Sequence, residues 1–198
     1  MNLSEALKIT NEITIWIHGK TNEIQVANEQ RIVVSLAVFQ QAMDVADGMV
    51  ILIENKLPGP AWALARALHE SYVRGVWLLD HADANQLENF VKGICPKISK
   101  LVKLIRDAQE SGGAWIRGIN DLNITSLHSL AHGGMEHVSR RIETGSIEPG
   151  YSEEETVNFL KLRNQYYVNI GVFILAIIQD EAALIELNNK TGEWKKAL

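Results

Sequence analysis

The sequence contains a single cysteine, Cys95, so no disulfide can form within the chain. This excludes the small scaffolds that are stapled by disulfides in oxidising compartments. The N-terminus, MNLSEALKITNE, lacks the basic start, the continuous apolar stretch and the small-residue cleavage site of a secretory signal. We therefore expect the protein to be cytoplasmic.

Long apolar runs and excess positive charge are also missing. The most apolar segment, residues 168–178, has roughly half of the ~20 residues that an α-helix needs to cross a bilayer, so it is typical of a core helix. We expect no membrane partner. A net charge of -5 argues against a surface that attracts nucleic acid all over, although a local basic groove is compatible with it.

Proline and alternating strand patterns are scarce, whereas apolar residues recur three and four positions apart along most of the chain. The length of 198 residues and the hydrophobic content of 46% are typical of one globular domain. We predict an all-α fold. It is a single-domain helical bundle over residues 1–198, with about six to seven helices and a long central C-terminal helix.

Residues that cap or break helices indicate where the expected helices begin and end. The prolines of the LPGP turn, residues 57–60, separate the second helix from the third because proline lacks an amide hydrogen. Ser152 has Glu155 three residues on, a capping-box spacing that opens a final helix of about thirty-five residues. Residues 144–151 are expected to be irregular. The expected helices span residues 4–19, 27–55, 60–81, 84–92, 96–109, 121–131 and 152–188.

The segment WALARALHESYVRGVW, residues 62–77, places charged residues on a helix that is otherwise apolar nearly all round. Arg66, Glu70 and Arg74 are four positions apart, so they share one helix face, and His69 lies beside them. Two interpretations stay open. The three residues form a buried network that fixes helix register, or one arginine is free to bind an anion such as phosphate, with His69 as a titratable neighbour.

A second polar segment contains His128 and His132, four positions apart and just before two glycines. This spacing permits shared metal ligation, but two ligands do not complete a site, and Ser129 stands where a zinc protease has glutamate. A pair that serves acid–base or anion chemistry, and a pair of packed structural histidines, are the alternatives.

Basic residues concentrate in the expected helix at 96–109, where a solvated face is the plainer interpretation: Lys97, Lys100, Lys103 and Arg106. No phosphate-binding glycine loop, dinucleotide fingerprint, nucleophile elbow or cysteine-based zinc motif occurs in the sequence. We expect no cofactor.

The two polar segments resemble a family of uncharacterised bacterial proteins, known only as a domain of unknown function. That family carries an arginine, a glutamate and an Arg-Gly-x-Trp run on one helix, followed further on by His-Gly-Gly. Here these are Arg66, Glu70, residues 74–77 and residues 132–134. The resemblance covers most of the chain and implies a fold and a site rather than a reaction.

A more distant resemblance is to HEPN-type helical domains of bacterial toxin–antitoxin and phage-defence systems, many of which are ribonucleases. Their signature is an arginine, often followed by a polar residue, with a histidine four to six residues further on, usually completed across a dimer. The nearest match begins at Arg163 and Asn164, but Val168 occupies the place of the histidine. Valine cannot exchange protons, so the usual HEPN site is absent in this form. The resemblance implies a homodimer.

Three functions remain open. In the first, Arg66 and Arg74 hold the phosphate of RNA, a nucleotide or another ligand, His69 and His128 exchange protons, and Glu70 and His132 orient them. In the second, the protein is a non-catalytic scaffold or antitoxin that binds a protein partner. In the third, it is a metal-dependent enzyme built on its histidines. We also predict that the two polar faces meet across one cleft, with Trp62 and Trp77 at its rim, because ionisable groups on apolar helices need partners.

Overall fold

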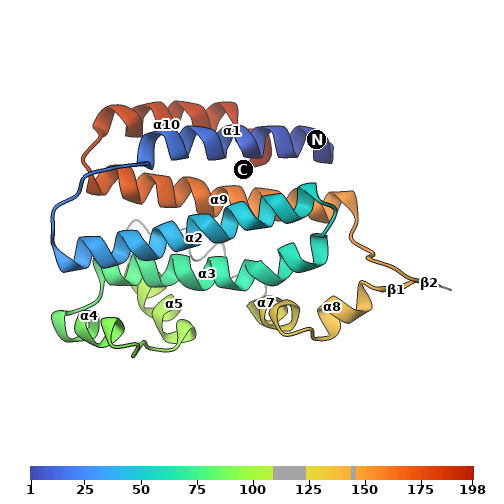
Figure 1. The fold of residues 1–198 in the computed structure, drawn as a ribbon, viewed down its shortest axis with the longest axis horizontal. Coiled ribbons are helices and arrows are strands. Elements are labelled where there is room, and N and C mark those ends of the chain that lie inside the picture. The colour runs from blue at the N-terminus through green and yellow to red at the C-terminus, as the bar shows by residue number, and fades with distance from the viewer. Residues whose placement is uncertain (109–123, 144–145) are drawn as a thin grey trace.

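The computed structural model of the chain describes residues 1–108, 124–143 and 146–198 (Figure 1). Helical residues make up 77% of this described part, far above the ~30–35% of an average globular protein. The prediction of an all-α fold is therefore confirmed.

Long helices stacked side by side form the body of the molecule (Figure 1). The two that follow each other directly in sequence, α2 and α3, pack along their length, and α9 contacts both of them as well as α1 and α10. A short 3-10 helix, η1, ends the chain. The bounds are α1 Leu3–Thr21, α2 Gln30–Glu54, α3 Pro58–Asp80, α9 Glu153–Ile177, α10 Glu181–Glu193 and η1 Lys195–Ala197.

Shorter elements lie along the other side of α3, at the lower edge of Figure 1. Two of these helices, α5 and α7, pack directly against α3. The bounds are α4 Ala84–Val91, α5 Ile98–Asp107, α7 Ile124–Ala131 and α8 Met135–Ser139, followed by the strands β1 Ile142–Glu143 and β2 Ser146–Ile147. The strands pair antiparallel, with Ile142 opposite Ile147.

A glycine allows α2 and α3 to approach closely. A Cβ atom on Gly75 would stand only 2.5 Å from the ring of Phe39, which is itself fully buried. Phe39 in turn stacks on Phe173 of α9, with ring centroids 5.4 Å apart. The glycine of the Arg-Gly-x-Trp run is therefore required by packing among three helices.

The C-terminal region differs from the single long helix expected from sequence. The helix stops at Ile177, Gln179 adopts a left-handed φ of 57°, and the side chain of Asp180 caps a new helix by accepting from the amide of Ala183 at 2.9 Å. The new helix, α10, lies beside α1 (Figure 1), where the side chain of Glu186 accepts from the indole of Trp16 at 2.8 Å. The sequence pattern did not reveal this break, since no proline or glycine marks it.

Smaller differences concern the helix ends. Asn2 caps α1 by accepting from the amide of Glu5, so this helix begins at Leu3, one residue before the expected start. The short helix α8 and the two-residue strands were not expected, while the capping box of Ser152 and Glu155 is present. The expected start of a helix at residue 121 lies outside the described residues.

The core lies around α9, as predicted from its apolar circumference. Buried side chains occupy several of its faces, among them Tyr166, Tyr167 and Ile170, which are all at most 1% exposed. Of the helices in the described residues, only α2 is long and apolar enough to cross a membrane by length and composition. The core helix of a globular protein meets the same test, so one such helix is weak evidence of a membrane span.

Candidate functional site

The charged ladder on α3 forms as its spacing predicts. Glu70 lies between two arginines: the Nε of Arg66 donates to its Oε1 at 2.7 Å, and the Nη2 of Arg74 donates to its Oε2 at 2.9 Å. Burial alone would raise the pKa of the Glu70 carboxyl, but the hydrogen bonds and charges of the two arginines lower it overall. Glu70 is thus ionised at neutral pH, and one carboxylate is shared by two cations.

The helix α7 brings the two histidines to this ladder. The rings of His128 and His132 are neighbours, with centroids 4.5 Å apart and planes tilted by 58°. The Nη1 of Arg66 contacts the Nδ1 of His128 and lies 2.7 Å from the Nε2 of His132. Because a guanidinium can only donate, both imidazoles accept at these nitrogens. The predicted meeting of the two polar faces is confirmed.

His69 faces inward and is only 2% exposed. Its Nδ1 lies 2.7 Å from the hydroxyl of Tyr166, while its Nε2 is buried and has no hydrogen-bond partner among the described residues. Burial lowers the pKa of His69 to about 4, against a smaller opposing effect of the Glu70 charge. The imidazole is therefore neutral at pH 7, a hydrogen-bonding group rather than a cation.

These groups line a cavity of about 520 Å³ between α3, α7 and the start of α5. Its size lies in the range typical of small-molecule sites. Arg66 and Arg74 are both about one third exposed. The lining residues are Arg66, His69, Glu70, Arg74, Cys95, Pro96, Lys97, Ile98, Ser99, Leu127 and His128. The lining thus contains three cationic side chains and one carboxylate.

The tryptophans do not form the expected rim. Trp77 is 1% exposed and packs edge-on against Phe90 of α4. Trp62 stacks on Phe159 of α9, with ring centroids 4.4 Å apart, and neither indole lines the cavity. Spacing along α3 predicted that both tryptophans lie near the charged ladder. Burial of a large aromatic ring in the core stabilises the fold, and both rings pack there instead.

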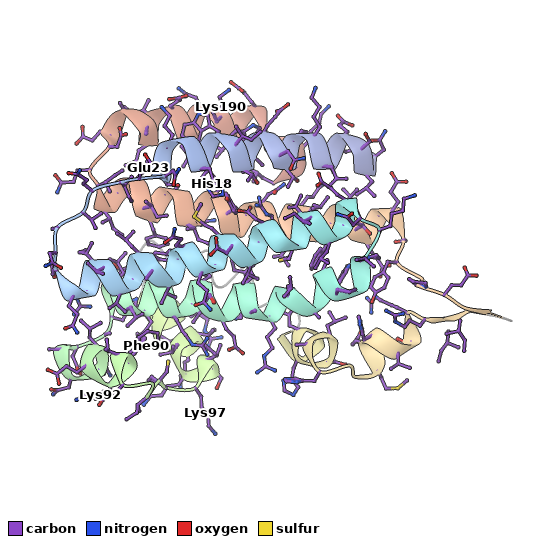
Figure 2. All side chains as sticks on the ribbon, viewed as in Figure 1. His18, Glu23, Phe90, Lys92, Lys97 and Lys190 are labelled. Atoms are coloured by element: carbon purple, nitrogen blue, oxygen red, sulfur yellow. The ribbon has the colours of Figure 1, made fainter. Side chains whose placement is uncertain are left out.

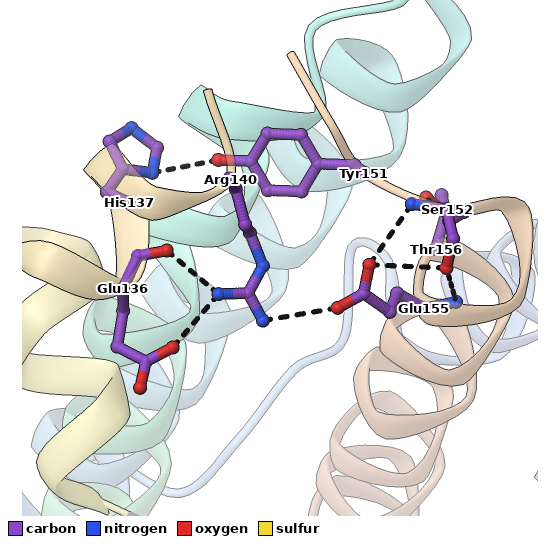
Figure 3. Close-up of polar contacts among 7 residues, drawn as sticks. All are labelled: Glu136, His137, Arg140, Tyr151, Ser152, Glu155 and Thr156. Carbon is purple, nitrogen blue, oxygen red and sulfur yellow. Dashed lines mark hydrogen bonds and ion pairs between the residues drawn. The ribbon is translucent and has the colours of Figure 1, made fainter. Parts of the chain in front are cut away.

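The polar residues after the two glycines form a separate cluster (Figure 3). Arg140 pairs with Glu136 of α8 at 2.9 Å and with Glu155 of α9 at 3.2 Å, while its guanidinium lies over the ring of Trp62. His137 is hydrogen-bonded to the hydroxyl of Tyr151. This cluster holds α8 against the start of α9, so it is a structural contact away from the cavity.

The residues of the HEPN-like match lie in the core. Arg163 is fully buried, donates to Asp47 at 2.6 Å and stacks on the ring of Tyr167. Asn164 is also buried and donates to the hydroxyl of Thr10. Neither side chain is placed to meet a substrate.

Metal binding receives no support from the residues described. Among them, no group of three or more histidine, cysteine, aspartate or glutamate side chains is placed to share a metal ion. His69 is turned toward Tyr166, while His128 and His132 both contact Arg66.

A sequence model of a family of unknown function, DUF6988, matches residues 39–198. The chain belongs to this family. The match includes the whole ladder on α3, both histidines of α7 and the start of α5. No curated protein and no solved structure matches the chain.

Sequence reasoning missed the contribution of α5. Residues 95–99 line the same cavity as His69, although the basic residues of this helix were interpreted as a solvated face. Only Lys97 of those four basic residues lines the cavity, and it lies at the outer edge of the molecule (Figure 2). Pro96, which precedes a helix start, was the available signal, because a helix N-terminus offers free amides.

Proposed function

We propose that the protein binds a phosphate-bearing ligand in the cavity between α3, α5 and α7. The observation that supports this most strongly is the sharing of Glu70 by Arg66 and Arg74. One carboxylate balances one arginine, so positive charge is left over at the wall of a partly enclosed cavity. Planar guanidinium groups suit phosphate oxygens, which they bind through paired hydrogen bonds.

Arg74 is the residue best placed to hold the ligand. It uses Nη2 for Glu70, and its other N–H groups have no partner among the described residues. Arg66, in contrast, is engaged by Glu70, His128 and His132. We assign Arg74 to direct phosphate contact and Arg66 to positioning of the two histidines.

His128 is the candidate for proton transfer if the ligand is also cleaved. It lines the cavity, is exposed, and accepts from Arg66 through Nδ1, so its Nε2 carries the hydrogen when the ring is neutral. A positioned imidazole is the most common general acid or base in enzymes. His69, being buried and neutral, is better suited to donate a hydrogen bond.

Binding of inorganic phosphate, nucleotides and short single-stranded RNA to the full chain, measured by calorimetry, tests the proposal. Arg74→Gln is expected to weaken binding of the active compound at least tenfold, since a charge-assisted contact is lost. Arg106→Gln makes the same charge change on α5 outside the cavity and is the matched control. Equal binding by wild type and Arg74→Gln would reject the proposal.

A scaffold or antitoxin-like protein is the second candidate, favoured by the fact that both oxygens of Glu70 are already bonded. In that case the ladder only joins α3 to α7. Glu70→Gln would then lower stability, and no phosphate compound would bind to the wild-type chain.

A further inference from the structure

The start of α5 forms one wall of the cavity that faces the arginines of α3. Residues 95–99, which are the turn before the helix and its first residues, all line this cavity. The first amides of an α-helix have no acceptor within the helix, and the positive end of the helix dipole lies there. The capping residue is Lys97, whose side chain has no acceptor to offer them.

A second, independent observation lies on the opposite wall. The Nε2 of His69 is buried without a partner among the described residues, in a side chain only 2% exposed. An unsatisfied polar atom in such a position costs free energy, so it is normally paired with protein, water or a ligand. Because His69 lines the same cavity, a ligand there is placed to supply the missing partner.

We propose that the cavity binds a small phosphate monoester, with the phosphate seated between Arg74, the first amides of α5 at Ile98 and Ser99, and the Nε2–H of His69. This inference rests on the proposed function and specifies its ligand. An anionic oxygen accepts hydrogen bonds, so the hydrogen of His69 is on Nε2, and Nδ1 accepts from the hydroxyl of Tyr166.

The ligand class follows from charge and size. A phosphate monoester carries close to two negative charges at neutral pH. The cavity lining holds three cationic side chains against the one carboxylate of Glu70, so this excess positive charge and the helix terminus match a monoester better than the single charge of each diester in RNA. A cavity of about 520 Å³ accommodates a small molecule. The net charge of -5 also disfavours a long polyanion that tracks over the surface.

A pair of substitutions at Ile98 isolates the amide contribution. Ile98→Ala and Ile98→Pro both remove the partly buried side chain, but only the proline removes the N–H. Proline is well tolerated at the first helical position, and Lys97 before it already has the extended ψ of 140° that a following proline requires. Both variants are therefore expected to fold.

The test is a calorimetric titration of the wild type and both variants with inorganic phosphate and with adenosine monophosphate, combined with ¹⁵N NMR of the full chain. Ile98→Pro is expected to bind about tenfold more weakly than Ile98→Ala. The amide signals of Ile98 and Ser99 and the ring nitrogens of His69 should shift on titration, which a purely structural role would not produce.

Each other outcome has a separate meaning. If phosphate binding depends on Arg74 but is equal in Ile98→Ala and Ile98→Pro, the inference is wrong and the proposed function stands. If short single-stranded RNA binds more tightly than the monoesters, with a steep salt dependence, the ligand class is wrong. If none of these phosphate compounds binds to the wild type, both the inference and the proposed function are rejected.

Discussion

Arg66 on α3 lies 2.7 Å from the Nε2 of His132, which is 66 residues further along the chain. The same guanidinium nitrogen also contacts His128. One arginine therefore joins the two polar segments that stand out in the sequence. It can do so only while both imidazoles accept, because protonation would replace each acceptor with a like charge.

His128→Ala is expected to weaken ligand binding while leaving the free energy of unfolding within about 0.5 kcal/mol of wild type. The side chain is exposed, and Arg66 keeps its bonds to Glu70 and His132. Calorimetric binding and thermal melting of the same preparation measure both quantities. A variant that melts much earlier and binds normally would show that His128 is structural.

Glu70→Gln is expected to lower the free energy of unfolding by about 1–2 kcal/mol. The cost stays below that of breaking a fully buried pair because both arginines are about one third exposed and keep contact with water. Urea unfolding measures the change. A loss near zero would mean that the ladder adds nothing to stability. Comparing the double variant Glu70→Gln, Arg66→Gln with both single variants measures the coupling energy between the two residues.

The pKa of about 4 for His69 predicts a specific dependence of stability on pH. Between pH 6.5 and about 4 the unfolded chain binds a proton on His69 that the native protein does not. Native stability therefore falls as the pH is lowered through this window, by up to about 3 kcal/mol. Urea unfolding at a series of pH values should show a smaller slope of stability against pH in His69→Gln than in wild type.

Arg163→Met is expected to cost about 3–5 kcal/mol, because it leaves the Asp47 carboxylate without its fully buried partner. His18 also contacts Asp47 but is nearly half exposed, so His18→Ala should cost less than about 1 kcal/mol. Chemical unfolding of both variants compares them directly. Similar small losses would mean that Arg163 is not essential to the core.

Gly75→Ala is expected to destabilise the protein by about 1–3 kcal/mol, although alanine favours helices, because its Cβ would overlap the ring of Phe39. Phe39→Leu in the same chain should recover part of the loss by making room. If Gly75→Ala is as stable as wild type, the close approach of α2 and α3 is not as described.

Helix periodicity and caps predicted the class of the fold and most helix positions, since amphipathic faces and prolines act locally. The break at residues 178–180 was missed because a left-handed Gln179 and a capping Asp180 leave only a weak mark in the sequence. Burial of the tryptophans was missed for a different reason. Spacing tells which residues share a face of α3, but only the positions of α4 and α9 decide where their rings pack.

The candidate site was predictable in part. Charged residues on an apolar helix need partners, and this requirement predicted that the ladder and the histidines of α7 lie together. Pro96 marks the start of α5 in the sequence, but the approach of this helix to the same place is a tertiary contact that the sequence does not reveal. The sequence likewise does not reveal that Nε2 of His69 lacks a hydrogen-bond partner among the described residues. This follows only from the structure, in which Nδ1 is hydrogen-bonded to the hydroxyl of Tyr166.

The most direct test of phosphate binding in this cavity is a crystal structure of the full chain grown with a phosphate monoester. We expect the phosphate oxygens within hydrogen-bond distance of Arg74, of the Ile98 and Ser99 amides and of the His69 Nε2. A ligand bound elsewhere, for example in the cavity lined by His18 and Asp44, or an empty cavity at saturating ligand, would contradict the account.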